Sequence, residues 1–361
     1  MRAVGGIKWD TMTSRRGFMS RIGAGALAGY GPIILGATNK SGSAKPILGE
    51  GDHKYECTHD WGELPANIKY GNTHGVCEDA QGHIYVHHTV NDASESHDSM
   101  VVFDRKGKFV KSWGKEFKGG AHGLHIHKEG KQEFLYLCDT KRAIMVKTTL
   151  DGEEVFTLGY PKESEFYKLD KDGKPATKYS PTNLAIAPNG DIYIGDGYGS
   201  SYINQYNSKG EFIRTFGGKG KEAGQLDCPH GITVDLRGPE PLLLVADRAN
   251  ARLQYFSLDG RHVSFVGGVN LPCHFSERHG EFVIPDLGAR VTLMDRNNQV
   301  IEHLGDDSAA KTWGELRKET RDHFTPGKFV CPHGACFDRE GNIFVVEWVE
   351  VGRVTKLRKV A

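Results

Sequence analysis

Residues 229–247 read PHGITVDLRGPEPLLLVAD, and this stretch decides the fold because its pattern recurs along the chain. A short opening motif leads into an alternating apolar strand, a glycine-containing turn and a second apolar run that ends in an acidic residue. Such a pattern is typical of β-hairpins. Six copies begin with the motifs THGV (73–76), AHGL (121–124), PTNL (181–184), PHGI (229–232), PCHF (272–275) and PHGA (332–335).

Each copy extends beyond this first hairpin. In the first five copies two further apolar runs follow, joined by another turn, as in NQYNSKGEFIRTF at 204–216. Six copies of four strands predict an all-β, six-bladed β-propeller. We expect it to occupy residues 45–361 as one domain, because all-β folds of this size commonly form a single unit.

The sixth copy ends with RVTKLRKVA (353–361) and has no room for a fourth strand. The segment KYECTHDW (54–61) has strand character and precedes the first copy. We predict that it pairs antiparallel with the last strand, which would close the ring and cover an exposed sheet edge.

The second residue of each opening motif, here called the opening position, carries a recurring side chain. In chain order the opening positions are His74, His122, Thr182, His230, Cys273 and His333. Alternate blades of a six-membered ring stand about 120° apart, so side chains from copies two, four and six can meet on the axis. Three imidazole nitrogens with a free fourth position form a catalytic zinc site. We therefore predict that His122, His230 and His333 bind one divalent metal ion, expected to be zinc.

Two further histidines disturb this symmetry. His74 has the same phase in the first copy, and His274 stands one residue late in the fifth. Both could support the ligands or the substrate, or simply line the channel, which we favour. A lone histidine near an inner strand is in general more often packed or water-bonded than a ligand.

Three motifs carry a resemblance to a known family. The runs GDGYGSSYINQY (195–206), CPHGITVD (228–235) and VADRANARLQYF (245–256) resemble the lyase domain of peptidylglycine α-amidating enzymes, a six-bladed propeller of the NHL type. The resemblance covers roughly residues 54–361. It implies zinc ligation by His122, His230 and His333, a tyrosine beside the metal at Tyr198, and a substrate-handling arginine at Arg248. The family reaction cleaves a peptidyl-α-hydroxyglycine into a peptide amide and glyoxylate.

The chain departs from the family at two places. VHHT (86–89) stands where the family has a further catalytic arginine, and Gly334 stands where an aspartate usually helps to bind calcium. We therefore carry over zinc and not calcium. Tyr198 could act as a base once a metal favours its phenolate, and Arg248 could hold a carboxylate through paired hydrogen bonds. The alternatives are that Tyr198 packs between blades and that Arg248 forms a structural salt bridge.

Residues 1–44 have the character of an export signal. Thr13-Ser14-Arg15-Arg16-Gly17-Phe18-Met19 precedes a glycine-rich apolar stretch at 22–37, as in twin-arginine signals. We expect a periplasmic or extracellular protein without a stable membrane span. No lysine- or arginine-rich stripe follows, which argues against a nucleic-acid partner. We expect a monomer that takes a small-molecule or peptide substrate.

The seven cysteines leave at least one thiol free if others pair, and their spacing assigns no pairing. Two connections, 160–179 and 305–329, are longer than the repeat requires. In the second, Trp313, Leu316, Thr320 and Phe324 follow a helical spacing, which predicts a short helix near the proposed metal.

Three functions remain open from the sequence. The first is an exported, metal-dependent lyase related to the amidating enzymes. The second is a non-enzymatic propeller that binds a peptide, glycan or protein with the same face. The third is a metal-dependent enzyme that acts on another small polar substrate.

Overall fold

The computed structural model describes residues 45–310 and 312–360, and all structural statements below concern these residues. The expected signal segment, 1–44, lies outside them, so the export signal and the domain boundary at 44/45 stay predictions. No helix in the described part of the chain is long and apolar enough to span a membrane.

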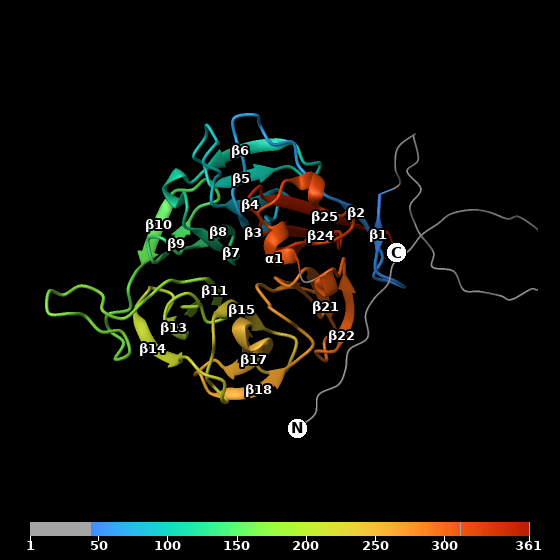
Figure 1. Cartoon of the computed structure of the whole chain (residues 1–361). Helices are drawn as coiled ribbons and strands as arrows, with labels where there is room; N and C mark the ends of the chain where they lie inside the picture. Colours follow the sequence, from blue (N-terminus) through green and yellow to red (C-terminus); the bar gives the residue numbers. More distant parts are fainter. Residues whose placement is uncertain (1–44, 311, 361) are drawn as a thin grey trace, which may run out of the picture. The chain divides into compact units, whose positions relative to one another are not determined.

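Six antiparallel sheets surround one axis, and the predicted six-bladed β-propeller is confirmed (Figure 1). The first blade contains β3 (Thr73–Glu78), β4 (Ile84–His88), β5 (Met100–Phe103) and β6 (Phe109–Trp113). The second contains β7 (Ala121–Glu129), β8 (Gln132–Asp139), β9 (Ile144–Thr148) and β10 (Glu154–Leu158). The third contains β11 (Asn183–Ile186), β12 (Ile192–Gly195), β13 (Tyr202–Tyr206) and β14 (Phe212–Gly217). The fourth contains β15 (Pro229–Asp235), β16 (Leu242–Asp247), β17 (Arg252–Ser257) and β18 (His262–Val266). The fifth contains β19 (Ser276–Arg278), β20 (Glu281–Asp286), β21 (Arg290–Met294) and β22 (Val300–Leu304). The sixth contains β23 (Pro332–Phe337), β24 (Ile343–Glu347) and β25 (Arg353–Lys359).

The core lies between neighbouring blades rather than at a single centre. For example, Tyr193 and Ile203 of the third blade pack against Val245 and Phe256 of the fourth. The second and third strands of each blade are buried on both faces, whereas the outermost strand is partly exposed. Tight hairpins need residues with positive φ, which Gly210 supplies between β13 and β14 with φ 80°.

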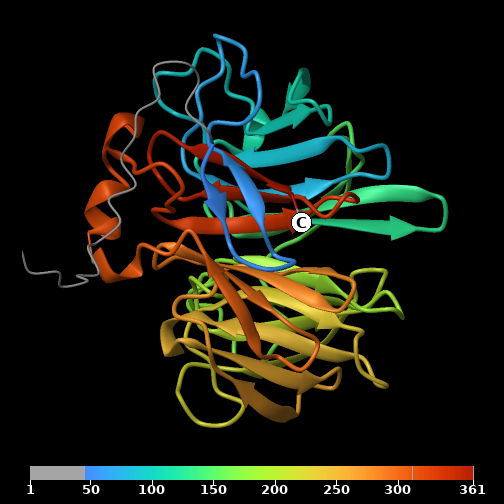
Figure 2. The same ribbon diagram turned by 90° about the vertical axis from the view of Figure 1, so that its right-hand side faces the viewer.

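The ring is closed by an N-terminal strand, as predicted. β2 (Tyr55–Thr58) pairs antiparallel with β25, with Tyr55 opposite Lys359 and Thr58 opposite Lys356. Figure 2 shows these blue and red strands side by side. A further two-residue strand, β1 (Ile47–Leu48), pairs with β2 and was not expected from the sequence. Tyr55 is buried and packs in the core of the sixth blade.

The acidic residues at the ends of the second strands act as hydrogen-bond acceptors that hold the loops before the opening motifs. Their partners are Ser180 N for Asp196 (2.7 Å), Asp227 N for Asp247 (2.7 Å), Asn270 N for Asp286 (3.1 Å) and Val330 N for Glu347 (2.7 Å). These contacts fix where each inner strand starts, and therefore where each opening position lies.

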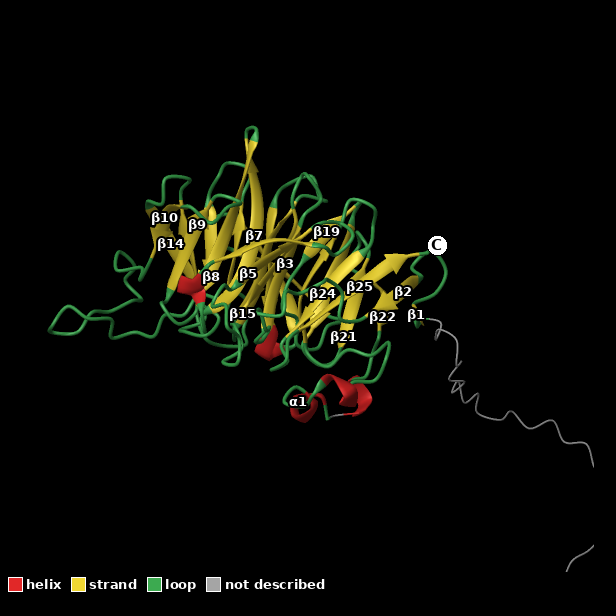
Figure 3. Ribbon diagram, turned by 90° about the horizontal axis from the view of Figure 1, so that it is seen from above, coloured by secondary structure: helices red, strands yellow, loops and turns green. Residues whose placement is uncertain are grey.

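The predicted helix at 312–324 is wrong in its length. The structure has α1 (Trp313–Leu316) and a separate 3₁₀ turn, Arg321–His323, because the Arg317 carbonyl accepts a hydrogen bond from Glu350 N (2.9 Å). The apolar spacing nevertheless marks the buried face, since Trp313, Leu316 and Phe324 pack in one cluster with Cys273. α1 lies beyond the strand ends on one side of the blades (Figure 3).

Candidate metal centre

Three histidines from alternate blades converge at the axis. His122, His230 and His333 are each the second residue of an innermost strand, β7, β15 and β23. Their ring centres lie 4.7 to 4.8 Å apart in all three pairs. The side chains are buried, with 2%, 0% and 4% of their surface exposed. The repeat phase thus brings together the three residues that the sequence singled out.

A β-bulge at the start of each of these strands aims the histidine. The register with the second strand shifts between Ala121 and Leu124, between Pro229 and Ile232, and between Pro332 and Gly334. A bulge adds one residue to one strand and turns its side chain out of the regular alternation. The same shift occurs between Thr73 and Gly75, around His74.

The Nδ1 atom of each histidine is held by a backbone carbonyl of the next blade. His122 Nδ1 lies 2.7 Å from Thr182 O, His230 Nδ1 lies 2.9 Å from Cys273 O, and His333 Nδ1 lies 3.0 Å from His74 O. Each Nδ1 therefore carries the proton and donates it to the carbonyl. Each Nε2 is then left with a lone pair, which is the form that ligates a metal.

The glycine after each histidine is explained by the same carbonyls. A Cβ atom at Gly123 would lie 2.6 Å from Thr182 O, and one at Gly231 would lie 2.6 Å from Cys273 O. At Gly334 it would lie 2.5 Å from His74 O. The histidine and the glycine thus act together. The histidine donates a hydrogen bond to the neighbouring blade, and the glycine leaves room for the backbone of that blade to approach. Position 334 has no room for the side chain of an aspartate without backbone movement.

Tyr198 and Arg248 lie at the open side of this cluster, where both are partly exposed. The Tyr198 hydroxyl oxygen lies 3.2 Å from His122 Nε2 and 3.1 Å from His230 Nε2. Arg248 Nη1 lies 3.5 Å from the same hydroxyl oxygen and 3.9 Å from Cys273 Sγ. The pKa of Tyr198 is raised by burial, which the nearby guanidinium partly offsets.

Burial keeps these imidazoles neutral. It lowers the pKa of His122 to about 3, and it lowers the pKa values of His74, His230 and His333 well below the usual 6.5. Several unprotonated imidazole nitrogens therefore lie close together. The Tyr198 hydroxyl lies between two of them, His122 Nε2 and His230 Nε2, and carries one proton. A hydroxyl can donate to only one of its two neighbours, so a bound cation would satisfy lone pairs that the protein does not.

Two groups of side chains in the described residues could hold a metal ion. One is His74, His122 and His333, and the other is His230, Cys273 and His333, each with ligand atoms within 4.8 Å of one another. Both contain His333, whereas His122 belongs to the first group and His230 to the second. His74 and Cys273 were not expected as ligands, although both occupy opening positions and could have been found by that phase.

His274 is not part of this cluster. Its Nδ1 lies 3.2 Å from Ala335 O, and its side chain lines a separate cavity of about 210 Å³ together with His125, Cys77 and Cys336. This location agrees with the channel-lining interpretation for His274. All seven cysteines are present as free thiols, and Cys77 and Cys336 are buried.

The first blade carries two buried histidines where the family has an arginine. His87 and His88 are both 0% exposed. His88 Nδ1 accepts a hydrogen bond from Val90 N (3.0 Å), so its Nε2 carries a proton, for which no protein acceptor is present among the described residues. Both nitrogens of His87 also lack protein partners. In the pairing of β3 with β4, His87 lies opposite Gly75 and His88 lies opposite Thr73, so both residues lie beside the neighbours of His74.

Comparison with known proteins confirms the predicted resemblance. No model of a known protein family matches the chain. The chain is 27% identical to peptidyl-glycine alpha-amidating monooxygenase A of Xenopus laevis over 238 residues, which are 58% of this chain and 24% of that protein. It is 28% identical to peptidyl-alpha-hydroxyglycine alpha-amidating lyase 1 of Drosophila melanogaster over 246 residues, 59% of this chain and 42% of the lyase. The chain thus matches less than half the length of these relatives.

Solved structures share the fold. A virginiamycin B lyase from Staphylococcus aureus superposes with a TM-score of 0.53 at 14% identity, covering 84% of this chain and 100% of that one. A gluconolactonase from Xanthomonas campestris superposes with a TM-score of 0.57 at 14% identity, covering 87% and 95%. At these identities the likeness concerns the fold alone.

Proposed function

We propose that this chain is an exported, zinc-dependent lyase of the amidating type, which breaks the C–N bond of a peptidyl-α-hydroxyglycine or a related small polar substrate. The observation that carries the proposal is the orientation of the three histidines. Each donates its Nδ1 proton outward to the next blade, which leaves its Nε2 lone pair free. The Nε2 atoms of His122 and His230 lie 3.2 and 3.1 Å from the Tyr198 hydroxyl oxygen.

Zinc fits this donor set better than calcium or magnesium. Neutral imidazole nitrogens suit zinc, whereas calcium and magnesium prefer oxygen ligands. His122, His230 and His333 would hold the ion, and their outward hydrogen bonds would fix the tautomer and the ring orientation. When bound, zinc supplies a positive charge that polarises an oxygen and lowers the pKa of a neighbouring hydroxyl.

Tyr198 is proposed to move the proton in this reaction. Cleavage requires that the α-hydroxyl loses its proton, that its oxygen becomes the carbonyl of glyoxylate, and that the amide nitrogen gains a proton as the C–N bond breaks. The Tyr198 oxygen, as phenolate, can accept the first proton and return it to the leaving nitrogen. Its position at the open side of the cluster, between two ligand nitrogens, supports this role.

Arg248 is proposed to bind the carboxylate of the substrate. Arg248 has no carboxylate partner among the ion pairs of the described residues. The neighbouring Asp247 is instead paired with Arg252, with Nε 2.7 Å from its Oδ2. The structural salt bridge considered for Arg248 is therefore absent from the described residues. A guanidinium without an acidic partner, 3.5 Å from Tyr198, is suited to a paired contact with a carboxylate.

The first blade favours a substrate that differs from the family's usual one. His88 offers one protonated Nε2, where the family's arginine offers several fixed donors. We propose that the C–N cleavage is retained. The part of the substrate that lies next to the first blade is proposed to be smaller or less acidic than in the family's usual substrate.

The test is glyoxylate release from a peptidyl-α-hydroxyglycine, measured together with elemental analysis of protein purified without added metal. The proposal expects about one zinc per chain and measurable turnover. Tyr198→Phe should lower turnover by at least about a hundredfold and leave the metal content unchanged. A metal-free protein would remove the enzyme proposal, and a fully metallated protein without turnover would leave a metal site with a different substrate.

Export by the twin-arginine route is a separate part of the proposal. It rests on Arg15 and Arg16 in the motif at 13–19 and on the apolar stretch that follows. Conversion of both arginines to lysine should retain the protein in the cytoplasm, as measured by cell fractionation. Unchanged export of this variant would contradict the route.

A further inference from the structure

We propose that His74 is a fourth protein ligand of the metal that His122, His230 and His333 hold. The inference rests on the proposed metal site and adds to it a residue from the first blade. It changes the expected coordination from three imidazoles and an open position to four imidazoles.

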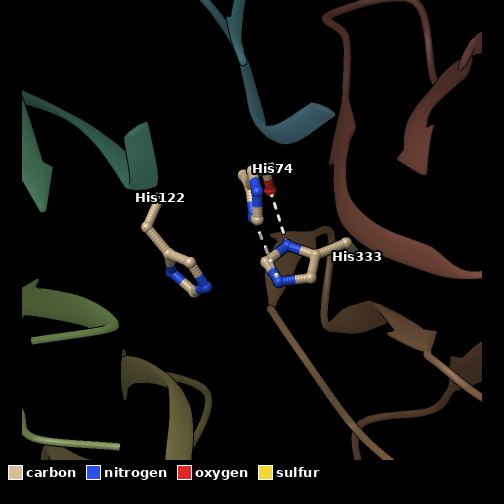
Figure 4. Close-up of side chains that lie close together, drawn as sticks. All are labelled: His74, His122 and His333. Carbon is tan, nitrogen blue, oxygen red and sulfur yellow. Dashed lines mark hydrogen bonds between the residues drawn. The ribbon is translucent and has the colours of Figure 1, made fainter. Parts of the chain in front are cut away.

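The distance between His74 and His333 is that of two ligands on one ion. His74 Nδ1 lies 3.4 Å from His333 Nε2. Zinc–nitrogen bonds of about 2.0 to 2.1 Å in a tetrahedral arrangement separate two ligand nitrogens by about 3.4 Å. His74, His122 and His333 have ligand atoms within 4.8 Å of one another, and Figure 4 shows the three rings turned toward a common point.

The hydrogen bonds around His333 lead to the same residue. His333 Nδ1 donates to His74 O, so His333 Nε2 is an acceptor, and His74 Nδ1 must be the donor in the 3.4 Å contact. Once His333 Nε2 binds a metal, its lone pair is no longer available to His74 Nδ1. The His74 side chain, which is 7% exposed, then either leaves that nitrogen unsatisfied or changes tautomer, with the proton on its own Nε2, and binds the ion through Nδ1.

The backbone holds His74 in place for this role. Its carbonyl accepts the His333 Nδ1 hydrogen bond at 3.0 Å, so the same residue supports one ligand and presents its own ring. The bulge between Thr73 and Gly75 is the same device that aims the other three histidines. A position fixed from both sides is preorganised, which a ligand requires.

Cys273 is the competing fourth ligand, and its contacts argue against it. Cys273 Sγ is positioned to donate to Leu271 O at 3.4 Å and lies 3.9 Å from Arg248 Nη1. His74 Nδ1, in contrast, has only His333 Nε2 as a side-chain partner. The structure therefore assigns the fourth position to the first blade rather than to the fifth.

Four protein nitrogens would change how a substrate reaches the metal. Tetrahedral sites with four protein ligands are closed, whereas catalytic sites keep one position open. A substrate oxygen could then bind only as a fifth ligand or by displacing His74. The Tyr198 hydroxyl lies beside His122 Nε2 and His230 Nε2, so a fifth ligand that approached from this side would meet the proposed base.

X-ray absorption spectroscopy of the zinc-loaded wild-type protein gives the number of imidazole ligands of the zinc ion, and it needs no amino-acid substitution. Four imidazole nitrogens are expected, and three would overturn the inference. In the cobalt-loaded protein, His74→Ala should change the visible absorption bands. It should also weaken metal affinity by more than about a hundredfold, beyond the 10- to 100-fold loss typical of an outer hydrogen-bonding partner.

The matched controls are His274→Ala and Cys273→Ser, which remove a channel histidine and the competing thiol. Neither should alter the cobalt spectrum. A change with Cys273→Ser and none with His74→Ala would assign the fourth position to the thiol and overturn the inference. A wild-type protein that binds no metal would instead refute the proposed function, so the two failures can be told apart.

Discussion

The guanidinium of Arg248 faces the phenol of Tyr198, with Nη1 3.5 Å from the hydroxyl oxygen and the guanidinium carbon 5.3 Å from the ring centre. The two residues come from different blades, since Tyr198 follows β12 and Arg248 follows β16. A cation at this distance favours the phenolate and so opposes the effect of burial on the pKa of Tyr198. The charge of Arg248 and the proposed base Tyr198 are thereby electrostatically coupled.

Arg248→Lys should weaken substrate binding and turnover together, because lysine cannot reproduce the planar pair of donors. We expect kcat/KM to fall at least about tenfold, equivalent to about 1.4 kcal/mol of transition-state stabilisation, with metal content unchanged. Steady-state kinetics and elemental analysis measure the two effects. Arg261→Lys, at an exposed pair with Asp259, serves as the control and should behave as wild type. Full activity of Arg248→Lys would remove the carboxylate-binding role.

Gly231→Ala should damage both stability and metal binding. The new Cβ would lie 2.6 Å from Cys273 O, the carbonyl that accepts the His230 Nδ1 hydrogen bond. Overpacking of this kind typically costs about 1–3 kcal/mol of unfolding free energy. Chemical denaturation and metal titration are the measurements. Gly314→Ala in α1 is the matched control, because a Cβ added there would meet no neighbouring side chain or backbone within 4 Å. Equal behaviour of the two variants would contradict the close approach of the blades.

Deletion of residues 45–61 should open the sixth blade. β25 would lose its partner β2 and present an unpaired edge, so we expect aggregation that depends on protein concentration. Size-exclusion chromatography and light scattering detect it. A shorter deletion of residues 45–51 removes β1 and keeps β2, and this control should remain dispersed. A dispersed, fully folded product of the longer deletion would show that closure by β2 is dispensable.

His59 should make part of the fold sensitive to acid. Burial lowers its pKa from 6.5 to about 4, while Nε2 accepts from Gly327 N (3.0 Å) and Nδ1 donates to Thr355 Oγ1 (2.8 Å). The unfolded chain binds this proton more readily, so the free energy of unfolding should fall as the pH drops from about 6.5 to about 4.

His59→Gln should lessen that fall without abolishing it, because other buried histidines contribute in the same direction. Denaturant unfolding at several pH values gives the slope. His323→Gln, at an exposed position, is the matched control for the loss of an imidazole. An identical slope for His59→Gln and wild type would mean that His59 titrates normally in the folded protein.

The repeat made the ring and its three axial histidines predictable, because a side chain at one phase of every second blade must face the axis. The role of His74 could not be read in the same way. Its phase is the same, but whether its ring turns toward His333 or down the channel depends on the bulge after Thr73 and on side-chain angles. The stop in the predicted helix after Leu316 likewise depends on a partner far along the chain, Glu350 N.

The pairing of β2 with β25 sets the order in which the protein can be completed. β2 is among the first described segments to leave the ribosome, and its partner in the sixth blade is the last strand to do so. Until then β2 has only the two residues of β1 to pair with, and the ring stays open. A chain that terminates early in synthesis can form several blades but no closed ring. Ring closure therefore requires that translation has run through β25, and chains that stop before β25 differ from those that contain it by an exposed sheet edge.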